Sequence, residues 1–199
     1  MIEQEAHLAA EVPDYLLEIL ARFTRLLRES TSVDQRSGVS ARFAVAGAET
    51  VSAAAVRRAA VLGEADPVAR PVDLESVVEV LRGKVEFESG EEGRELEVLE
   101  HLLRRATADT VRVRLGGIDL GMLVAAVEMG NTIVTGESVT AKAFLDELPD
   151  LEVLDEVAER LGAQSDGERA AGAELALEGL YLARRISKDQ GPGGRSVYS

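Results

Sequence analysis

Two arginines, Arg36 and Arg42, flank the glycine-containing segment 37–41, which we expect to open a helix. A guanidinium presents a planar fork of donors that matches phosphate oxygens, and a helix N-terminus adds a favourable field for an anion. This spacing indicates a contact with a phosphate group. An ion pair between an arginine and the nearby Asp34 is the alternative interpretation.

Other nucleotide-binding patterns do not fit the chain. The pair Gly83-Lys84 is followed by valine and lacks the upstream glycine that a phosphate-binding loop needs. The glycines at 116 and 117 lack the spacing of a dinucleotide loop and indicate the end of a helix instead. Two acidic pairs, within 144–147 and 154–156, lie in helical patterns rather than after a buried strand, so we interpret them as structural.

The sequence also gives little support for a metal-binding site or a catalytic nucleophile. His7 and His101 are the only histidines, and neither follows a glutamate or histidine by three residues, as a carboxylate-bridged metal site would require. Cysteine is absent, so the sequence offers no thiol nucleophile and no disulfide. No general base can be paired with a nucleophile, and we therefore expect no catalytic residue and no metal ligand in this chain.

The charge distribution disfavours nucleic acid as a partner. The net charge is -14, and residues 1–61 hold 8 acidic and 7 basic residues, so 28 of the 36 acids fall in residues 62–199 beside 15 bases. Such an acidic surface repels a phosphate backbone. No stretch of about 18 apolar residues exists, which argues against a membrane span. Without cysteines or a signal-like N-terminus, the expected compartment is the cytoplasm.

The elements that must position the arginines are predicted to be mainly α-helical, because apolar residues recur at intervals of three and four. In the first helix, which begins near Pro13, these positions are Leu16, Leu20, Phe23 and Leu27. The second helix runs from about 37 to Gly63 and is rich in alanine. Further helices are expected at 73–81, 96–115, 119–130, 139–148, 151–161 and 166–187, with a short β-like stretch at 132–135.

Three segments resemble the C-terminal region of AAA+ ATPases of the magnesium chelatase subunit I type. They are residues 36–58 (RSGVSARFAVAGAETVSAAAVRR), 81–88 (LRGKVEFE) and 180–188 (LYLARRISK). In that family an α/β core with the ATP pocket precedes a helical lid, whose arginine senses the nucleotide. The resemblance implies an AAA+ lid-like helical domain at 1–64 and a helical tail domain at 65–187. The glycine-rich segment that follows, 188–199, is expected to be a flexible C-terminal tail.

The same resemblance implies a function and its partners. Arg42 matches the nucleotide-sensing arginine best, and Arg36 is the next candidate. ATP and Mg²⁺ would be bound by a core domain that this sequence lacks, and we expect no cofactor in this chain alone. The implied parent protein is an ATPase that forms a homo-oligomeric ring, works as a magnesium chelatase or a chaperone, and can pair with a protein carrying a metal-ion-dependent adhesion-type domain.

Two other functions stay open from the sequence. A free-standing helical module could use its acidic surface to bind a basic protein partner. A small enzyme in its own right has less support, because no catalytic pair can be assembled. A phosphate-loop motif encoded in frame just upstream would favour the ATPase interpretation over the module.

Overall fold

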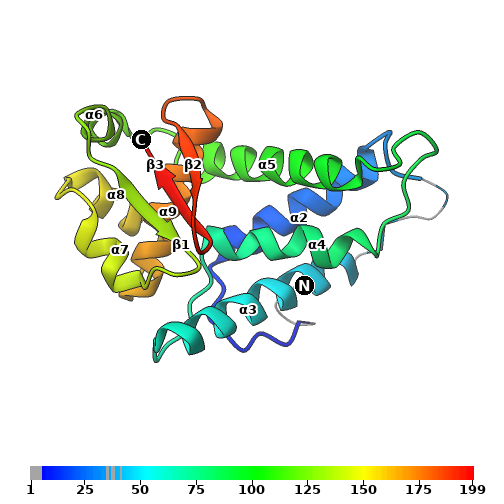
Figure 1. The fold of residues 1–199 in the computed structure, drawn as a ribbon, viewed down its shortest axis with the longest axis horizontal. Coiled ribbons are helices and arrows are strands. Elements are labelled where there is room, and N and C mark those ends of the chain that lie inside the picture. Colours follow the sequence, from blue (N-terminus) through cyan, green and yellow to red (C-terminus); the bar gives the residue numbers. More distant parts are fainter. Residues whose placement is uncertain (1–5, 35, 37–38, 41) are drawn as a thin grey trace.

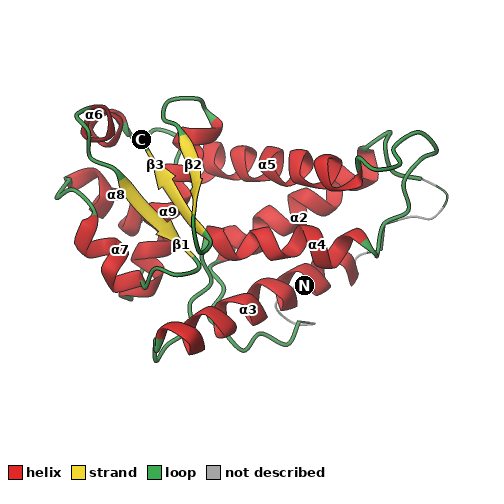
Figure 2. Cartoon of the chain, in the orientation of Figure 1, coloured by secondary structure: helices red, strands yellow, loops and turns green. Residues whose placement is uncertain are grey.

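The computed structural model describes residues 6–199 except 35, 37, 38 and 41, and it is mainly α-helical (Figures 1 and 2). Helices α2, α3, α4 and α5 lie together at one end of the molecule, while α6 to α9 gather at the other end beside a small sheet. The helices are α2 (Asp14–Glu29), α3 (Arg42–Leu62), α4 (Glu75–Arg82), α5 (Glu95–Arg114), α6 (Gly121–Glu128), α7 (Ala141–Glu147), α8 (Glu152–Leu161) and α9 (Asp166–Leu182), with a 3₁₀ turn η1 (Pro71–Leu74) before α4.

Helix α2 forms as its apolar stripe predicts. Leu16, Leu20, Phe23 and Leu27 are all buried, and Pro13 occupies the N-cap. The buried face packs against α5 and α3. On the partly exposed side, Glu18 accepts a hydrogen bond from Arg114 Nε at 2.7 Å, which fastens α2 to the end of α5.

Helix α3 packs closely on α2 because its contact face carries small residues. Ala48 and Ala55 are fully buried, and a Cβ placed on Gly47 would lie only 3.2 Å from Leu20 Cδ2. The helix ends before Gly63, whose φ of +73° suits a residue without a side chain. The structure begins α3 at Arg42 rather than near 37, and residues 37 and 38 lie outside the described part of the chain.

The predicted helices in the middle of the chain are present with adjusted ends. The valines at 111 and 113 lie in α5, as the helix predicted at 96–115 requires. The segment predicted to span 166–187 ends at Leu182, because the chain turns at Arg184 with a φ of +58°. Ser165 and Glu168 form a capping box at the start of α9.

Residues 188–199 were expected to form a flexible tail, but the structure places them in a β-hairpin. Strands β2 (Lys188–Gly191) and β3 (Arg195–Tyr198) pair antiparallel, and β3 also pairs antiparallel with β1 (Ile133–Gly136), giving the order β1-β3-β2. The expectation followed the glycine content and overlooked Tyr198, which is 2% exposed. Gly136 permits the close approach, because a Cβ there would lie 2.1 Å from the Gly194 carbonyl oxygen.

The hydrophobic core is continuous across the two ends of the molecule. It joins Leu20 of α2 and Val51 of α3 to Leu99 of α5, Leu175 of α9 and Tyr198 of β3. The core therefore has no break at the proposed boundary between residues 64 and 65. In the part of the chain that the structure describes, no helix has the length and apolar character needed to cross a membrane.

We expect the substitution Tyr198→Ala to lower the free energy of unfolding by about 3–4 kcal/mol, because it removes a buried aromatic ring and leaves a cavity. Urea denaturation followed by circular dichroism measures the loss. Val61→Ala serves as the control, since Val61 is 78% exposed and its truncation should change stability by less than about 0.5 kcal/mol. Equal stability of Tyr198→Ala and the native chain would contradict a structural role for the hairpin.

Candidate functional site

The loop that carries Arg36 is held against a second loop. Val33 and Phe87 form an antiparallel bridge, Asp34 N donates to Glu86 O at 2.9 Å, and Glu88 N donates to Ser32 O at 3.0 Å. These backbone hydrogen bonds fix residues 32–34 directly before the arginine segment. The segment is therefore anchored at its N-terminal side to the turn between α4 and α5.

Arg36 is engaged by a neighbouring carboxylate. Its side chain is 87% exposed, and Nε lies 3.1 Å from Asp34 Oδ1. The hydrogen bonds and the charge of Asp34 raise the pKa of Arg36, with a smaller contribution from Glu88. The alternative interpretation from the sequence, an ion pair with Asp34, therefore describes Arg36. An exposed pair of this kind can exchange its carboxylate for another anion at little cost.

Arg42 differs from Arg36 in its surroundings. It is the first residue of α3, it is exposed, and its backbone nitrogen donates to Ser40 Oγ at 3.0 Å. Within the described residues its guanidinium makes no ion pair, whereas Arg36 is paired with Asp34. The next residue, Phe43, packs on Phe23 with ring centroids 5.7 Å apart. The start of α3 is thus fixed to α2 while the Arg42 side chain projects into solvent.

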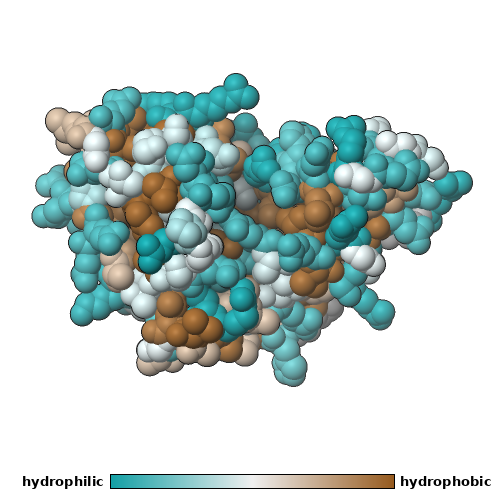
Figure 3. Space-filling view, in the orientation of Figure 1, coloured by the Kyte–Doolittle hydropathy of each residue, from teal (hydrophilic) through white to brown (hydrophobic). Residues whose placement is uncertain are grey.

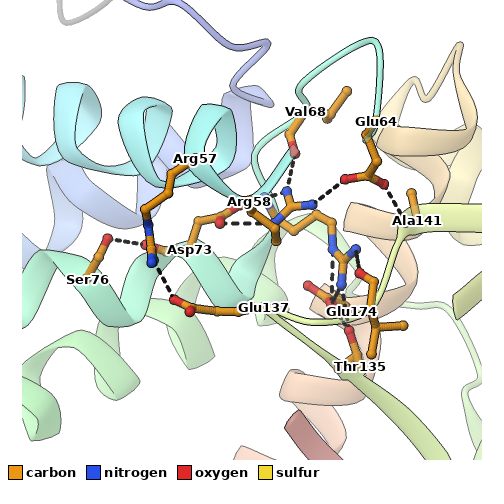
Figure 4. Close-up of polar contacts among 12 residues, drawn as sticks. Arg57, Arg58, Glu64, Val68, Asp73, Ser76, Thr135, Glu137, Ala141 and Glu174 are labelled. Carbon is orange, nitrogen blue, oxygen red and sulfur yellow. Dashed lines mark hydrogen bonds and ion pairs between the residues drawn. The ribbon is translucent and has the colours of Figure 1, made fainter. Parts of the chain in front are cut away.

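The far end of α3 is held by a buried arginine, Arg58, drawn in Figure 4. Arg58 donates through Nε and Nη2 to the two carboxylate oxygens of Asp73 at 3.2 and 3.1 Å, a bidentate pair. It also donates to Glu64 Oε2 at 2.9 Å and to Val68 O at 2.7 Å. Glu64 in turn accepts from the backbone nitrogen of Ala141 at 2.7 Å, which ties α3 to the start of α7.

A second buried arginine, Arg70, continues the network toward α9. Its side chain is fully buried, and Nη2 lies 2.5 Å from Glu174 Oε1. It also donates to Thr135 Oγ1 at 2.8 Å and to Val139 O at 2.9 Å. Thr135 itself donates to Glu174 Oε1. The contacts of Arg58 and those of Arg70 meet at Asp73, which also accepts a hydrogen bond from the backbone nitrogen of Arg70 at 2.8 Å.

The Glu174 carboxylate favours the charged form of Arg70 inside the protein. Burial by itself lowers the pKa of Arg70, but the charge and hydrogen bonds of Glu174 outweigh it, so the pKa is raised. Each guanidinium also donates a hydrogen bond to a backbone carbonyl oxygen, which satisfies N–H groups that the carboxylates do not reach. Residues from α3, η1, β1 and α9 thus meet in one network, which we call the double-arginine network (Arg58, Glu64, Arg70, Asp73, Thr135 and Glu174).

Helix α3 connects the double-arginine network to Arg42. Arg58 and Arg42 are sixteen positions apart in one helix, so about 24 Å separates them along the axis at 1.5 Å per residue. Arg58 fixes its end of α3 to η1 through the buried pair with Asp73.

The double-arginine network could not be recognised from the sequence. Arg70 and Glu174 are 104 positions apart, and no spacing rule links them. The sequence around Pro71 gave a partial signal, since proline favours an extended Arg70 and a helix was predicted to begin at Asp73.

No metal site emerges from the described residues. They contain no group of three or more His, Asp or Glu side chains placed to hold a metal ion. The acidic pairs of the sequence analysis lie in α7 and α8, where Asp155 Oδ1 is 2.5 Å from Arg169 Nη2.

Comparison with known proteins identifies no relative. No protein-family model, no curated protein and no solved structure matches the chain.

We expect Arg70→Met to reduce the free energy of unfolding by about 3–5 kcal/mol, because it leaves the Glu174 carboxylate buried without its partner. The double variant Arg70→Met/Glu174→Leu should lose at least about 2 kcal/mol less than the sum of the single variants. Urea denaturation of the four proteins measures this coupling.

The exposed pair Arg57 and Glu137, whose side chains are 61% and 43% exposed, provides a matched control. Its double-variant cycle should give a coupling below about 1 kcal/mol. Additive losses at Arg70 and Glu174 would show that the buried pair does not act as a unit.

Proposed function

We propose that this chain is the C-terminal nucleotide-sensing lid and regulatory region of an AAA+ ATPase of the magnesium chelatase subunit I or chaperone type. The observation that carries the proposal is the exposed Arg42 guanidinium at the first residue of α3, without an ion pair in the described part of the chain. It is supported by the resemblance of residues 36–58 to the lid of that family.

In this proposal the residues of the chain act in sequence from Arg42 inward. When ATP is bound by a separate core domain, its γ-phosphate supplies the anion that Arg42 contacts. Arg36 contributes a second positive charge that can leave Asp34. The rigid helix α3 then transfers the position of Arg42 to the double-arginine network, which sets the orientation of α7 and α9.

The proposal keeps the partners implied by the resemblance. ATP and Mg²⁺ belong to the core domain, the parent protein forms a ring, and a protein with a metal-ion-dependent adhesion-type domain is a candidate partner. The proposed compartment is the cytoplasm. Residues 1–64 act as the lid and residues 65–187 as the regulatory tail, with the hairpin at 188–199 included in that tail.

In a protein that joins the ATP-binding core to this chain, Arg42→Ala should lower kcat for ATP hydrolysis at least about tenfold, which corresponds to about 1.4 kcal/mol of transition-state stabilisation. Arg36→Ala should have a smaller effect, since Arg36 is already paired with Asp34. Steady-state phosphate release measures both.

Arg25→Ala is the matched control, because Arg25 is an exposed arginine on α2. It should leave kcat unchanged. Equal turnover by the Arg42 variant, the Arg25 variant and the unmodified protein would defeat the assignment of Arg42 as the sensor.

The chain by itself should bind ATP very weakly. One millimolar ATP with Mg²⁺ should raise the melting temperature by less than about 1 °C, because a ligand stabilises the folded state only when its concentration approaches the dissociation constant. Differential scanning fluorimetry measures the shift. A rise of several degrees would mean that the chain has an ATP site of its own.

The acidic charge of residues 62–199 favours a second candidate, a helical module that binds a basic protein partner. In that case Arg42→Ala would leave ATP hydrolysis unchanged, and partner binding would weaken steeply with salt. The same set of variants therefore separates the two candidates.

A further inference from the structure

A cleft of about 450 Å³ lies between the C-terminal hairpin and helices α4, α5 and α9, and Arg42 is not part of its lining. Figure 3 shows this face hollowed beside the hairpin, with hydrophobic residues inside the hollow and hydrophilic residues around it. Helices α4 and α5 pack against each other and form the walls of the groove that continues the cleft away from the hairpin. Arg82 Nη2 at the end of α4 lies 3.3 Å from Glu95 Oε2 at the start of α5, so the two helices run antiparallel along the groove (Figure 1).

The side of α5 that lines the groove carries the spacing of a helix-packing seam. Leu96 and Leu103 are seven positions apart, and Val78 of α4 shares the lining with them. Seven residues is the repeat at which apolar side chains of one helix meet those of a neighbouring helix. Leu96 is nevertheless 36% exposed, so the described residues do not cover this end of the seam.

The length of this face indicates what could cover it. Leu96, Glu100, Leu103 and Thr107 lie at i, i+4, i+7 and i+11 on α5 and all line the cleft. At 1.5 Å per residue this face is about 16 Å long, which matches about three turns of a second helix. A helix fits the seven-residue repeat, whereas an extended segment presents side chains to one side at every second residue.

The rim of the groove is acidic and has no unpaired base. Glu79 of α4 is exposed and makes no ion pair within the described residues, and Glu100 is 48% exposed in its side chain. The bases in the lining are already engaged, since Arg104 lies 2.6 Å from Glu100 and Lys188 lies 2.9 Å from Glu178. The seam is therefore apolar at its centre and negative at its edges, which complements a helix with an apolar side flanked by positive charges.

Glu75, at the hairpin end of the groove, shows the same shortage of positive charge. Its side chain is 58% exposed, and its nearest cation, Lys188, is 3.8 Å away. Partial desolvation raises the pKa of Glu75, Lys188 opposes this rise, and nearby glutamates such as Glu178 add to it. A positive side chain supplied from outside the chain would reduce the repulsion among these carboxylates.

We propose that the groove between α4 and α5 binds an amphipathic basic helix of a partner protein. The apolar side of that helix packs on Leu96 and Leu103, and lysine or arginine side chains at its edges donate to Glu79 and Glu100. The inference deepens the second candidate function, on which it rests, by giving the basic partner a defined surface. It does not involve nucleotide sensing by Arg42.

The test uses a synthetic peptide of about four helical turns, made of leucine, alanine and lysine and held helical by a side-chain bridge. Its leucines lie at i, i+3, i+4 and i+7, with lysines on both flanks. The control peptide has the same composition and charge, but its leucines are spread around the helix. Fluorescence polarisation with the full chain in 150 mM NaCl, which suppresses non-specific attraction, measures affinity. We expect saturable binding of the first peptide and binding at least about tenfold weaker for the control.

The apolar contact is tested with Leu96→Lys, which should weaken binding of the peptide at least about tenfold. Val80→Lys is the matched control, because Val80 is a 49% exposed residue of α4 outside the lining and receives the same charge. It should change affinity less than about twofold. Thermal melting followed by circular dichroism verifies that both variants fold.

The charged rim is tested with Glu75→Gln/Glu79→Gln, which should weaken binding at least about fivefold. The control Glu156→Gln/Glu159→Gln makes the same change in net charge on exposed positions of α8 and should change affinity less than about twofold. Amide NMR shifts should be largest along α4 and α5.

Equal affinity for the two peptides, equal weakening by Leu96→Lys and Val80→Lys, or NMR shifts scattered over the acidic surface would each overturn the proposal. Arg42→Ala should leave peptide binding unchanged. Loss of the nucleotide-sensing assignment and loss of the groove proposal are therefore separate results.

Discussion

The burial of two arginine charges constrains the whole structure. Removing a guanidinium from water is costly unless carboxylates and carbonyls replace the lost hydration. The groups that accept hydrogen bonds from Arg58 and Arg70 lie on η1, α9, β1 and the loops around them. All of these segments must be in place together. The helices at the two ends of the molecule are therefore fixed relative to each other by charge as well as by the hydrophobic core.

The two ends of α3 differ in how their arginine side chains are held. At one end its side chains are committed to buried contacts, and at the other Arg42 is exposed and uncommitted within the described residues. In the proposed function, α3 would relay the position of Arg42 to its buried end. The small residues on its face, such as Gly47 against Leu20, let it pack without large side chains that would need to rearrange.

The sequence predicted the helices well because each carries its own periodic signal. The stripe through Leu16 and Leu27 and the glycine after α3 depend on near neighbours alone. The hairpin was missed because β2 is polar and its partner β3 is short, so pairing and the burial of Tyr198 decide the outcome. Of the site, the role of Arg42 stays a prediction, whereas Glu174 could not be linked to Arg70 without the fold.

The strand order has a consequence for how the protein folds. β1 has no hydrogen-bonded neighbour until β3, which lies about sixty positions further along the chain, arrives between it and β2. Such distant pairing is entropically demanding and tends to be slow. Thr135 lies on β1, where it accepts a hydrogen bond from Arg70 and pairs with Ser196 of β3. Pairing of β3 with β1 is therefore linked, through Thr135, to the position of the buried Arg70 side chain.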